Sequence, residues 1–430
     1  MSNFLLFHEK ITTHNYFNVR KLINKKPFSS SKNMSDIRGS KEKYTFESTI
    51  SAPSDGIIYR YDNTQDLIVS AVTAPGLLSL YEPLPFMEDF VSVLSFNVKK
   101  ERYELFAVYD GHGGRDSRTG IKKGGFEVAE ECVSYIPEML KKALKNNHDD
   151  IKAMLPKIFE KADKDHFTKN FRENVGSTAI IMLKNNKNIY IANLGDSRAV
   201  ICKDGKEFFA TVDCDWTLPS EQERIGINKN NPTYVMNTKY GSKKFILNGK
   251  FLNGEKWNMA ASRSFGDYHF KLDAENPPVI AKPDVHSYQI DNDMKLILIA
   301  SDGIWENEKG LVSDHYISKF IQIAKKQDSP NADKCLEETC KEFVKWCMIG
   351  QLKFEYRNNG DNIALIAIGI LNGKSKEEWF RDIKNWKGKC EDSNLILKDI
   401  NDTIQDDVEE VDDIDYGSDS EDCKIDFTQL

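Results

Sequence analysis

Aspartates at the ends of apolar runs constrain the fold of this chain more than any other feature. Asp110 ends the run LFAVY, Asp302 ends KLILIAS, Asp196 follows IYIANLG, and Asp361 stands just before IALIAIGI. Runs of this kind are typical of core strands, which do not ordinarily finish in a charged side chain. The pattern therefore predicts that these carboxylates need a cation.

An ordinary interpretation of each aspartate stays open. Asp-Gly is a common hairpin turn, and His112, two residues after Asp110, could be a solvated turn residue. Four such strand ends favour a metal site instead, as does the acidic pair Glu88 and Asp89 at the start of another strand. Oxygen donors without a Cys or His cluster at ligand spacing favour Mg²⁺ or Mn²⁺ over zinc. Two such ions about 3.5–4 Å apart can bridge a hydroxide that attacks phosphorus.

Longer segments around these aspartates follow one another in order from about Met87 to Leu371. They are MED, FAVYDGHGG, GSTAIIML, ANLGDSRAVICKDGK, QERI, NMAASRSFGD, AKPDV, LILIASDGIWE and GDNIALIAIGI. In this order they resemble the PPM family of metal-dependent serine/threonine protein phosphatases, also called type 2C. Single pieces such as DG or GDN would be weak signals, whereas the ordered set is highly specific.

The resemblance implies roles for individual residues. It makes Asp110 the bridging ligand of two Mg²⁺ or Mn²⁺ ions, and hence both a metal ligand and a catalytic residue. His112 matches the general acid that protonates the leaving serine or threonine alkoxide. The other metal positions are a backbone carbonyl, two further carboxylates and an acidic pair that holds metal-bound waters: Gly111, Asp302, Asp361, Glu88 and Asp89. A third metal position matches Asp196 and Glu306 together with Asp302, although the family more usually has aspartate in place of Glu306.

Substrate binding is where the chain departs from the family. In the family, an arginine four residues before the glutamate of the acidic pair binds the substrate phosphate. This chain has Leu84 at that position. One lost charge-assisted hydrogen bond costs about 1.5–3 kcal/mol. Arg115 and Arg118, which follow DGHGG, could replace the arginine or could be solvated loop residues. The flap, from about Asp213 to Trp257, has ATVDCDW where the family has a His-Lys-Pro stretch, which predicts altered substrate contacts.

The order of elements supports the fold that the resemblance implies: an α+β fold with a central sandwich of two antiparallel β-sheets flanked by α-helices. Apolar runs separated by tight polar turns such as KNNKN and KDGK predict hairpins. The expected strands are Phe90–Phe96, Leu105–Tyr109, Ser177–Leu183, Ile189–Leu194, Arg198–Cys202, Val285–Ile290, Leu296–Ala300 and Ile363–Ile370. Apolar positions three and four apart predict helices at Phe126–Ala143, Ile151–Ala162, Val312–Ala324 and Asp333–Cys347, with one further helix outside the core at Ser375–Trp386.

Charge and composition divide the chain into four parts. These are a basic extension over residues 1–45, the phosphatase-like domain over 46–372, an additional helix over 373–390 and an acidic tail over 391–430. The net charge is −8, but residues 401–430 hold twelve Asp or Glu against one Lys, so the rest of the chain is slightly basic. We expect both ends to be disordered, because little apolar surface can be buried there. Ser418 and Ser420 resemble casein kinase 2 sites, with a plain solvating tail as the alternative.

Cysteine usage and hydropathy bear on location and partners. The eight cysteines show no CxxC pair and are expected to be reduced thiols inside the cell. No apolar run approaches the roughly 18 residues of a membrane span. We expect a monomer in the cytoplasm, the nucleus or both, which acts on phosphorylated proteins and binds no nucleic acid. The basic extension leaves an organellar presequence open.

Two classes of function stay open. The first is an active phosphoserine and phosphothreonine phosphatase, which the set of carboxylates favours. A binding-only relative has no reason to keep several costly, mutually repelling acids around one point. The second is a pseudophosphatase or regulatory protein-binding module that uses the same fold, and Leu84 supports it.

Overall fold

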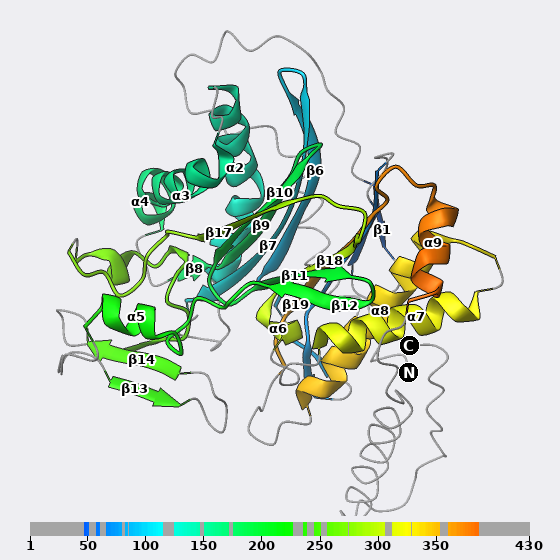
Figure 1. Cartoon of the computed structure of the whole chain (residues 1–430). Coiled ribbons are helices and arrows are strands. Elements are labelled where there is room, and N and C mark those ends of the chain that lie inside the picture. The colour runs from blue at the N-terminus through cyan, green and yellow to red at the C-terminus, as the bar shows by residue number, and fades with distance from the viewer. Residues whose placement is uncertain are drawn as a thin grey trace, which may run out of the picture.

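Two antiparallel β-sheets of seven strands each lie face to face at the centre of the protein, as its computed structural model shows (Figure 1). The structure describes residues 47–50, 57–60, 66–79, 82–84, 86–114, 124–146, 150–171, 175–226, 235–238, 245–250, 256–273, 275–305, 312–327, 329–352 and 360–386. The expected basic extension and acidic tail lie outside these residues, and so do Ser418 and Ser420.

Each sheet joins strands that are distant in the sequence. The first has the order β1 (Glu47–Ile50), β2 (Ile57–Arg60), β3 (Leu67–Ala74), β19 (Ile363–Ile370), β18 (Met294–Ala300), β11 (Arg198–Lys203) and β12 (Lys206–Ala210). The second has the order β16 (Phe265–Gly266), β8 (Val175–Ser177), β7 (Glu101–Gly113), β9 (Ala179–Lys184), β10 (Asn188–Leu194) and β17 (Asp284–Gln289), and β6 (Asp89–Val98) also pairs with β7. As a result, segments from both halves of the chain meet at one edge of the sandwich.

The hydrophobic core has an inner layer between the sheets and an outer layer on each side. In β18, Ile297 and Ile299 belong to the inner cluster, whereas Leu296 and Leu298 belong to a cluster shared with helices. Successive side chains of a strand point to opposite faces, so a strand covered on both faces has to be apolar throughout. This burial explains why the run before Asp302 has no alternation of polar and apolar residues.

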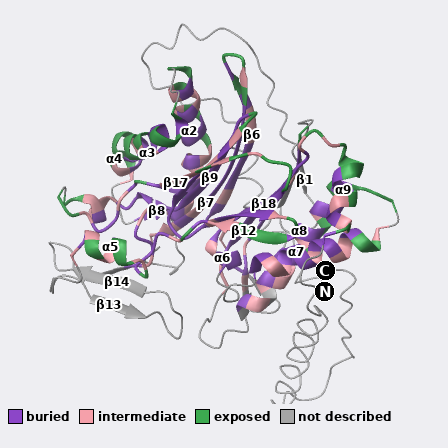
Figure 2. Cartoon of the chain, in the orientation of Figure 1, coloured by how far each residue is buried: buried purple, intermediate pink, exposed green. Residues whose placement is uncertain are grey.

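Helices cover the outer face of each sheet, with buried residues on the faces that meet the strands (Figures 1 and 2). The second sheet is covered by α2 (Gly125–Lys145) and α3 (Ile151–Ala162), and the first by α7 (Val312–Lys326), α8 (Ala332–Leu352) and α9 (Lys376–Lys384). The shorter helices are the π-helix η2 (Asp163–Phe167), α4 (Thr168–Asn170), α5 (Pro219–Arg224), the 3₁₀-helix η4 (Tyr268–Lys271) and α6 (Asp302–Trp305). None of the helices in the described ranges has the length and apolar character to cross a membrane.

Two small sheets lie outside the sandwich. The flap contributes β13 (Val235–Thr238), β14 (Phe245–Lys250) and β15 (Lys256–Met259), which form a three-stranded sheet. The strands β4 (Leu77–Ser79) and β5 (Glu82–Pro83) form a short hairpin just before the acidic pair. Leu84 follows this hairpin directly.

The expected fold class is confirmed: two antiparallel sheets form a sandwich with helices on both sides. Every expected strand and helix has a counterpart, while β3, in the middle of the first sheet, was not foreseen. The expectation that the last helix lies outside the core is wrong. Trp379 and Ile383 of α9 are fully buried in the outer cluster, and the Trp379 ring packs where a side chain at Gly369 would stand.

Candidate active site

The register of the first long hairpin brings two carboxylates together. Asp89 at the start of β6 lies directly opposite Asp110 near the end of β7. The backbone N–H of Gly111 donates to the carbonyl of Glu88 at 3.0 Å, which extends the strand pairing one residue beyond Asp89 and Asp110. Gly111 has no room for a side chain, because a Cβ there would lie 2.4 Å from the carbonyl oxygen of Gly125 at the start of α2.

The first sheet supplies two more carboxylates from neighbouring strand ends. The N–H of Ser301 donates to the carbonyl of Ala364 at 3.0 Å, and the N–H of Ala364 donates to the Ser301 hydroxyl at 2.9 Å. Because β18 and β19 are antiparallel, the residue after Ser301 and the residues before β19 lie at the same edge. Asp302 and Asp361 therefore stand side by side in the fold.

Asn362 connects the two sheets at this edge. Its side-chain oxygen accepts a hydrogen bond from the N–H of Glu88 at 2.6 Å. Its amide group donates to the carbonyls of Pro75 at 2.7 Å and Phe86 at 3.1 Å. Asn362 thus holds the entrance of β6, with its acidic pair, against the residue that follows Asp361. The sequence analysis quoted the GDN segment but gave Asn362 no role.

The carboxylates at this edge repel one another. Burial raises the pKa of the Asp110 carboxyl well above its usual range. Four neighbouring carboxylates raise that pKa further: Asp89, Asp302, Asp361 and Asp196. Burial also raises the pKa of Asp89, and the charges of Asp361 and Asp302 add to the effect. Five of the predicted acids therefore share one electrostatic environment, Asp196 among them from the turn between β10 and β11.

These donors fit a hard divalent cation. All of them offer carboxylate oxygens, and Oδ2 of Asp89 is buried without a hydrogen-bond partner. Within the described ranges, no three His, Cys, Asp or Glu side chains are placed so that they could by themselves hold a metal ion. Mg²⁺ commonly keeps several water ligands and uses only one or two protein carboxylates directly. The acids are therefore suited to a partly hydrated ion, while the individual ligand roles remain predictions.

His112 lies beside the carboxylates and is paired with an acid that the sequence analysis overlooked. Its Nε2 is 2.7 Å from Oδ2 of Asp267, and the two side chains are 24% and 1% exposed. Burial opposes the ionisation of Asp267, but the nearby His112 charge and hydrogen bonds from His112 and Ser264 outweigh it and lower the pKa. The sequence analysis quoted the NMAASRSFGD segment, but no apolar run precedes Asp267 to mark it as a site acid.

Leu84, at the position of the family's arginine, is buried beside the site. Its side chain is 4% exposed, and its N–H donates to the carbonyl of Gly76 at 3.1 Å. Gly76 in turn packs on Asp361, where a Cβ would lie 2.1 Å from the Asp361 carbonyl oxygen. The three remaining candidates lie outside the described residues: Arg115, Arg118 and Glu306.

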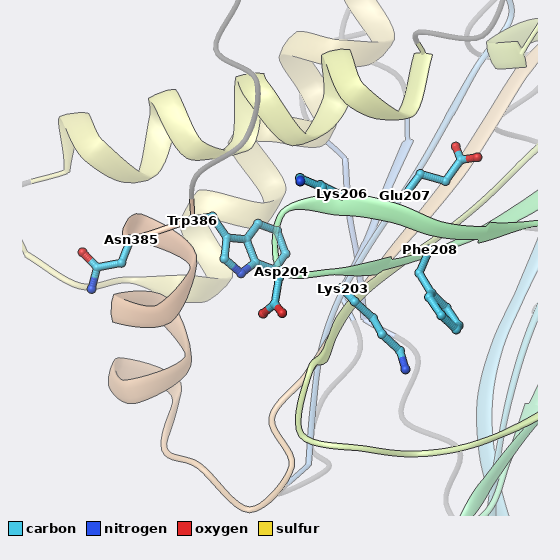
Figure 3. Close-up of a pocket in the computed structure, with 7 residues that line it drawn as sticks. All are labelled: Lys203, Asp204, Lys206, Glu207, Phe208, Asn385 and Trp386. Carbon is cyan, nitrogen blue, oxygen red and sulfur yellow. The ribbon is translucent and has the colours of Figure 1, made fainter.

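A hollow lies at the end of β11 opposite the carboxylates (Figure 3). It is lined by Lys203, Asp204, Lys206, Glu207, Phe208, Asn385 and Trp386. Its two basic and two acidic side chains balance, and Lys203 is already paired with Asp291. None of the predicted site residues lines this hollow.

The chain belongs to the protein phosphatase 2C family, whose sequence model matches residues 85–349, more than half of its length. The matched residues include all of the predicted site except Leu84 and Asp361, which lie outside them. The resemblance found in the sequence is thereby confirmed.

Curated relatives carry the same family name. "Protein phosphatase 2C homolog 2" of Aspergillus fumigatus is 29% identical over 302 residues, which are 67% of this chain and 61% of that protein. "Probable protein phosphatase 2C 7" of Oryza sativa is 27% identical over 290 residues, 67% of this chain and 63% of that protein. The chain thus spans about three fifths of the length of these relatives.

Solved structures share the fold at lower identity. A C. elegans sex determining protein has a TM-score of 0.55 and 17% identity, and the match covers 75% of this chain and 69% of that one. A phosphatase from Toxoplasma gondii has a TM-score of 0.50 and 19% identity, with 71% and 94% covered. At these identities the likeness supports the architecture alone.

Proposed function

We propose that this protein is an Mg²⁺- or Mn²⁺-dependent protein serine/threonine phosphatase. The observation that carries the proposal is the shared environment of Asp89, Asp110, Asp196, Asp302 and Asp361, which come from both sheets to one edge. Membership of the protein phosphatase 2C family supports the same activity. The substrates would be proteins that carry phosphoserine or phosphothreonine.

Two cations at the sheet edge would be held by Asp110, Gly111, Asp302, Asp361, Glu88 and Asp89. Asp196 and Glu306 would serve a third. Bound Mg²⁺ or Mn²⁺ supplies a nucleophilic water and stabilises the charge that develops on the phosphate. Mutual repulsion among the acids favours cation binding, because each carboxylate is more stable beside a positive charge than beside another carboxylate.

His112 would act on the leaving group. A serine or threonine alkoxide is a poor leaving group, so a proton delivered as the P–O bond breaks accelerates the reaction by about 10²–10⁴-fold. The ring is only partly exposed and lies one residue from Gly111, which supports a role as proton donor beside the predicted cation site. Arg115 and Arg118, which directly follow the DGHGG loop in the sequence, remain candidates for phosphate binding.

The test is hydrolysis of phosphoserine and phosphothreonine peptides by the full chain. We expect activity with Mn²⁺ or Mg²⁺ that EDTA removes and added metal restores. Asp293→Asn, at an exposed turn before β18, is the matched control for an Asp→Asn change and should keep wild-type activity. A purified, folded chain that hydrolyses no phosphopeptide with either metal would contradict the proposal and favour the binding-only alternative.

A further inference from the structure

The His112 side chain is fixed on one side by a buried acid from a distant part of the chain. Asp267 lies 155 residues away in the sequence and contacts His112 through Nε2 at 2.7 Å. The Ser264 hydroxyl donates to the same Asp267 oxygen, Oδ2, at 2.5 Å. An ionised carboxylate only accepts hydrogen bonds, so the proton of this contact lies on Nε2.

Gly176 packs directly against this pair. A Cβ at Gly176 would lie 2.2 Å from Oδ2 of Asp267 and 2.7 Å from Nε2 of His112, closer than side-chain atoms pack. Glycine is therefore required here by the contact itself. The register of β8 supports the arrangement, because Gly176 lies opposite His112 on β7 and opposite Gly266 on β16.

The turn that carries Asp267 is held by a second buried acid. Asp267 has a left-handed backbone with φ of 52°, which is uncommon for a residue other than glycine, and its N–H donates to the Val175 carbonyl at 2.8 Å. Asp163 of the π-helix η2 accepts from the N–H of Gly266 at 2.8 Å and from Lys271 Nζ at 2.7 Å. Lys271 also donates to the Ser264 carbonyl at 2.8 Å. Such strain persists where surrounding contacts fix it and often marks a functional site.

We propose that Asp267 is a positioning residue that holds the His112 ring in one orientation and one tautomer, so that the ring can protonate the leaving oxygen of the substrate. The inference rests on the proposed function and names the group behind its proton donor. His112 gives a ring proton to the alkoxide as the P–O bond breaks, while Asp267 stays ionised and keeps accepting the hydrogen bond from the N–H at Nε2. A purely structural pair would stabilise the fold equally well without this directional effect.

Kinetics on two substrates separate these roles. A phosphoserine peptide needs protonation of its leaving group, whereas 4-nitrophenyl phosphate does not, because its leaving group is already a stable anion. Asp267→Asn keeps the size of the side chain and removes its charge. We expect kcat for the peptide to fall about ten-fold or more, with KM and the rate on 4-nitrophenyl phosphate little changed.

The double variant tests whether the two residues act as a unit. His112→Gln with Asp267→Asn should be no slower on the peptide than His112→Gln alone, since residues of one unit do not contribute additively. Equal slowing of both substrates by Asp267→Asn, or additive losses in the double variant, would overturn the inference.

Gly176→Ala disturbs the contact between His112 and Asp267 while leaving Asp267 in place. This variant therefore tests the inference even if Asp267→Asn does not fold. It should reproduce the selective loss on the phosphopeptide. Gly369→Ala is the matched control, because its Cβ would lie 2.6 Å from the Trp379 ring in the outer core, and it should leave the ratio of the two activities unchanged. Equal effects of both glycine variants on that ratio would also overturn the inference.

A spectroscopic readout is independent of turnover. In ¹⁵N-histidine-labelled protein we expect a slowly exchanging ring N–H signal that His112→Gln removes and that Asp267→Asn shifts or removes. A wild-type chain without activity on either substrate would end the phosphatase proposal, and the ring signal would still report on the pair. An Asp267→Asn signal identical to wild type would show that Asp267 does not orient the ring.

Discussion

Two buried aspartates of the candidate site, Asp89 and Asp267, differ in the direction of their pKa shifts. Both are almost fully buried, at 3% and 1% exposed. The pKa of Asp89 is raised, by burial first and then by the charges of Asp361 and Asp302. The pKa of Asp267 is lowered, because the nearby His112 charge and hydrogen bonds from His112 and Ser264 outweigh burial. The neighbours of a buried acid therefore decide the direction of its pKa shift. We call the surroundings of Asp89 the cation environment and those of Asp267 the proton-donor environment, after their proposed roles.

The largest expected effect is a loss of activity when an acid of the cation environment is neutralised. Asp110→Asn removes a charge that no neighbour can replace, so the rate on a phosphopeptide should fall by about 10³-fold or more. The fold should survive, which circular dichroism would check. If Asp110→Asn kept wild-type turnover in excess Mn²⁺, Asp110 would not be a required metal ligand. The cation environment would then have no chemical role that separates it from the environment of Asp267.

Cation binding should stabilise the folded chain through the cation environment only. Mg²⁺ at one hundred times its Kd would raise the free energy of unfolding by about 2.7 kcal/mol. Asp110→Asn should lose this stabilisation, whereas Asp267→Asn should keep it. Thermal unfolding with and without metal measures this stabilisation in both variants. If both variants lost it, the two environments would belong to one cation site.

Without metal, neutralising the two acids should change stability in opposite directions. Asp89→Asn relieves the burial of a repelled charge and should stabilise the protein by about 1–3 kcal/mol. Asp267→Asn removes hydrogen bonds to a charged group and should destabilise it by about 1.5–3 kcal/mol. Urea unfolding in EDTA gives both values. A change of the same sign in both variants would remove the contrast drawn from their pKa shifts.

The pH dependence of these stability changes sharpens the contrast. The folded pKa of Asp89 is raised above 3.8, so its cost grows as pH rises from that value, and the gain from Asp89→Asn should shrink between pH 7 and pH 5. The folded pKa of Asp267 is lowered, so its contribution is complete above pH 3.8 and is lost only as pH falls through the folded pKa. The part of the Asp267→Asn deficit that comes from ionisation of Asp267 itself should therefore stay constant from pH 7 to pH 5. A parallel pH course for the two variants in EDTA would be evidence against opposite shifts.

The smallest effect concerns Leu84, which lies next to the cation environment and not the proton donor. Leu84→Arg should improve kcat/KM on a phosphopeptide by about ten-fold or more, mainly through KM, because one charge-assisted contact of about 1.5–3 kcal/mol is restored. The control is Arg115→Ala, which should raise KM if that residue already binds the phosphate. An unchanged KM in both variants would mean that another group holds the substrate.

The sequence predicted those parts of the site that are encoded locally. Asp110, Asp302 and Asp361 each adjoin an apolar run, so the end of a strand and the residue beside it are read from one short segment. Asp267 and Gly176 could not be paired in this way, because their contact with His112 depends on the register of β7, β8 and β16. The same holds for α9: its helical period was evident, but only the sheet shows which surface the Trp379 ring fills. The strand β3 was missed because no motif adjoins its apolar run.

The wide separation of the carboxylates along the chain has a kinetic consequence. Asp89 and Asp361 come from opposite ends of the domain, and they are neighbours only when both sheets are assembled with β6 against β7 and β18 against β19. A cation therefore has no site to bind in a partly folded chain and cannot act as a nucleus for folding. Bound Mg²⁺ should slow unfolding and leave the refolding rate unchanged, since contacts absent from the transition state affect only the unfolding limb. For this protein, the supply of metal would set how long the native state lasts and not how quickly it forms.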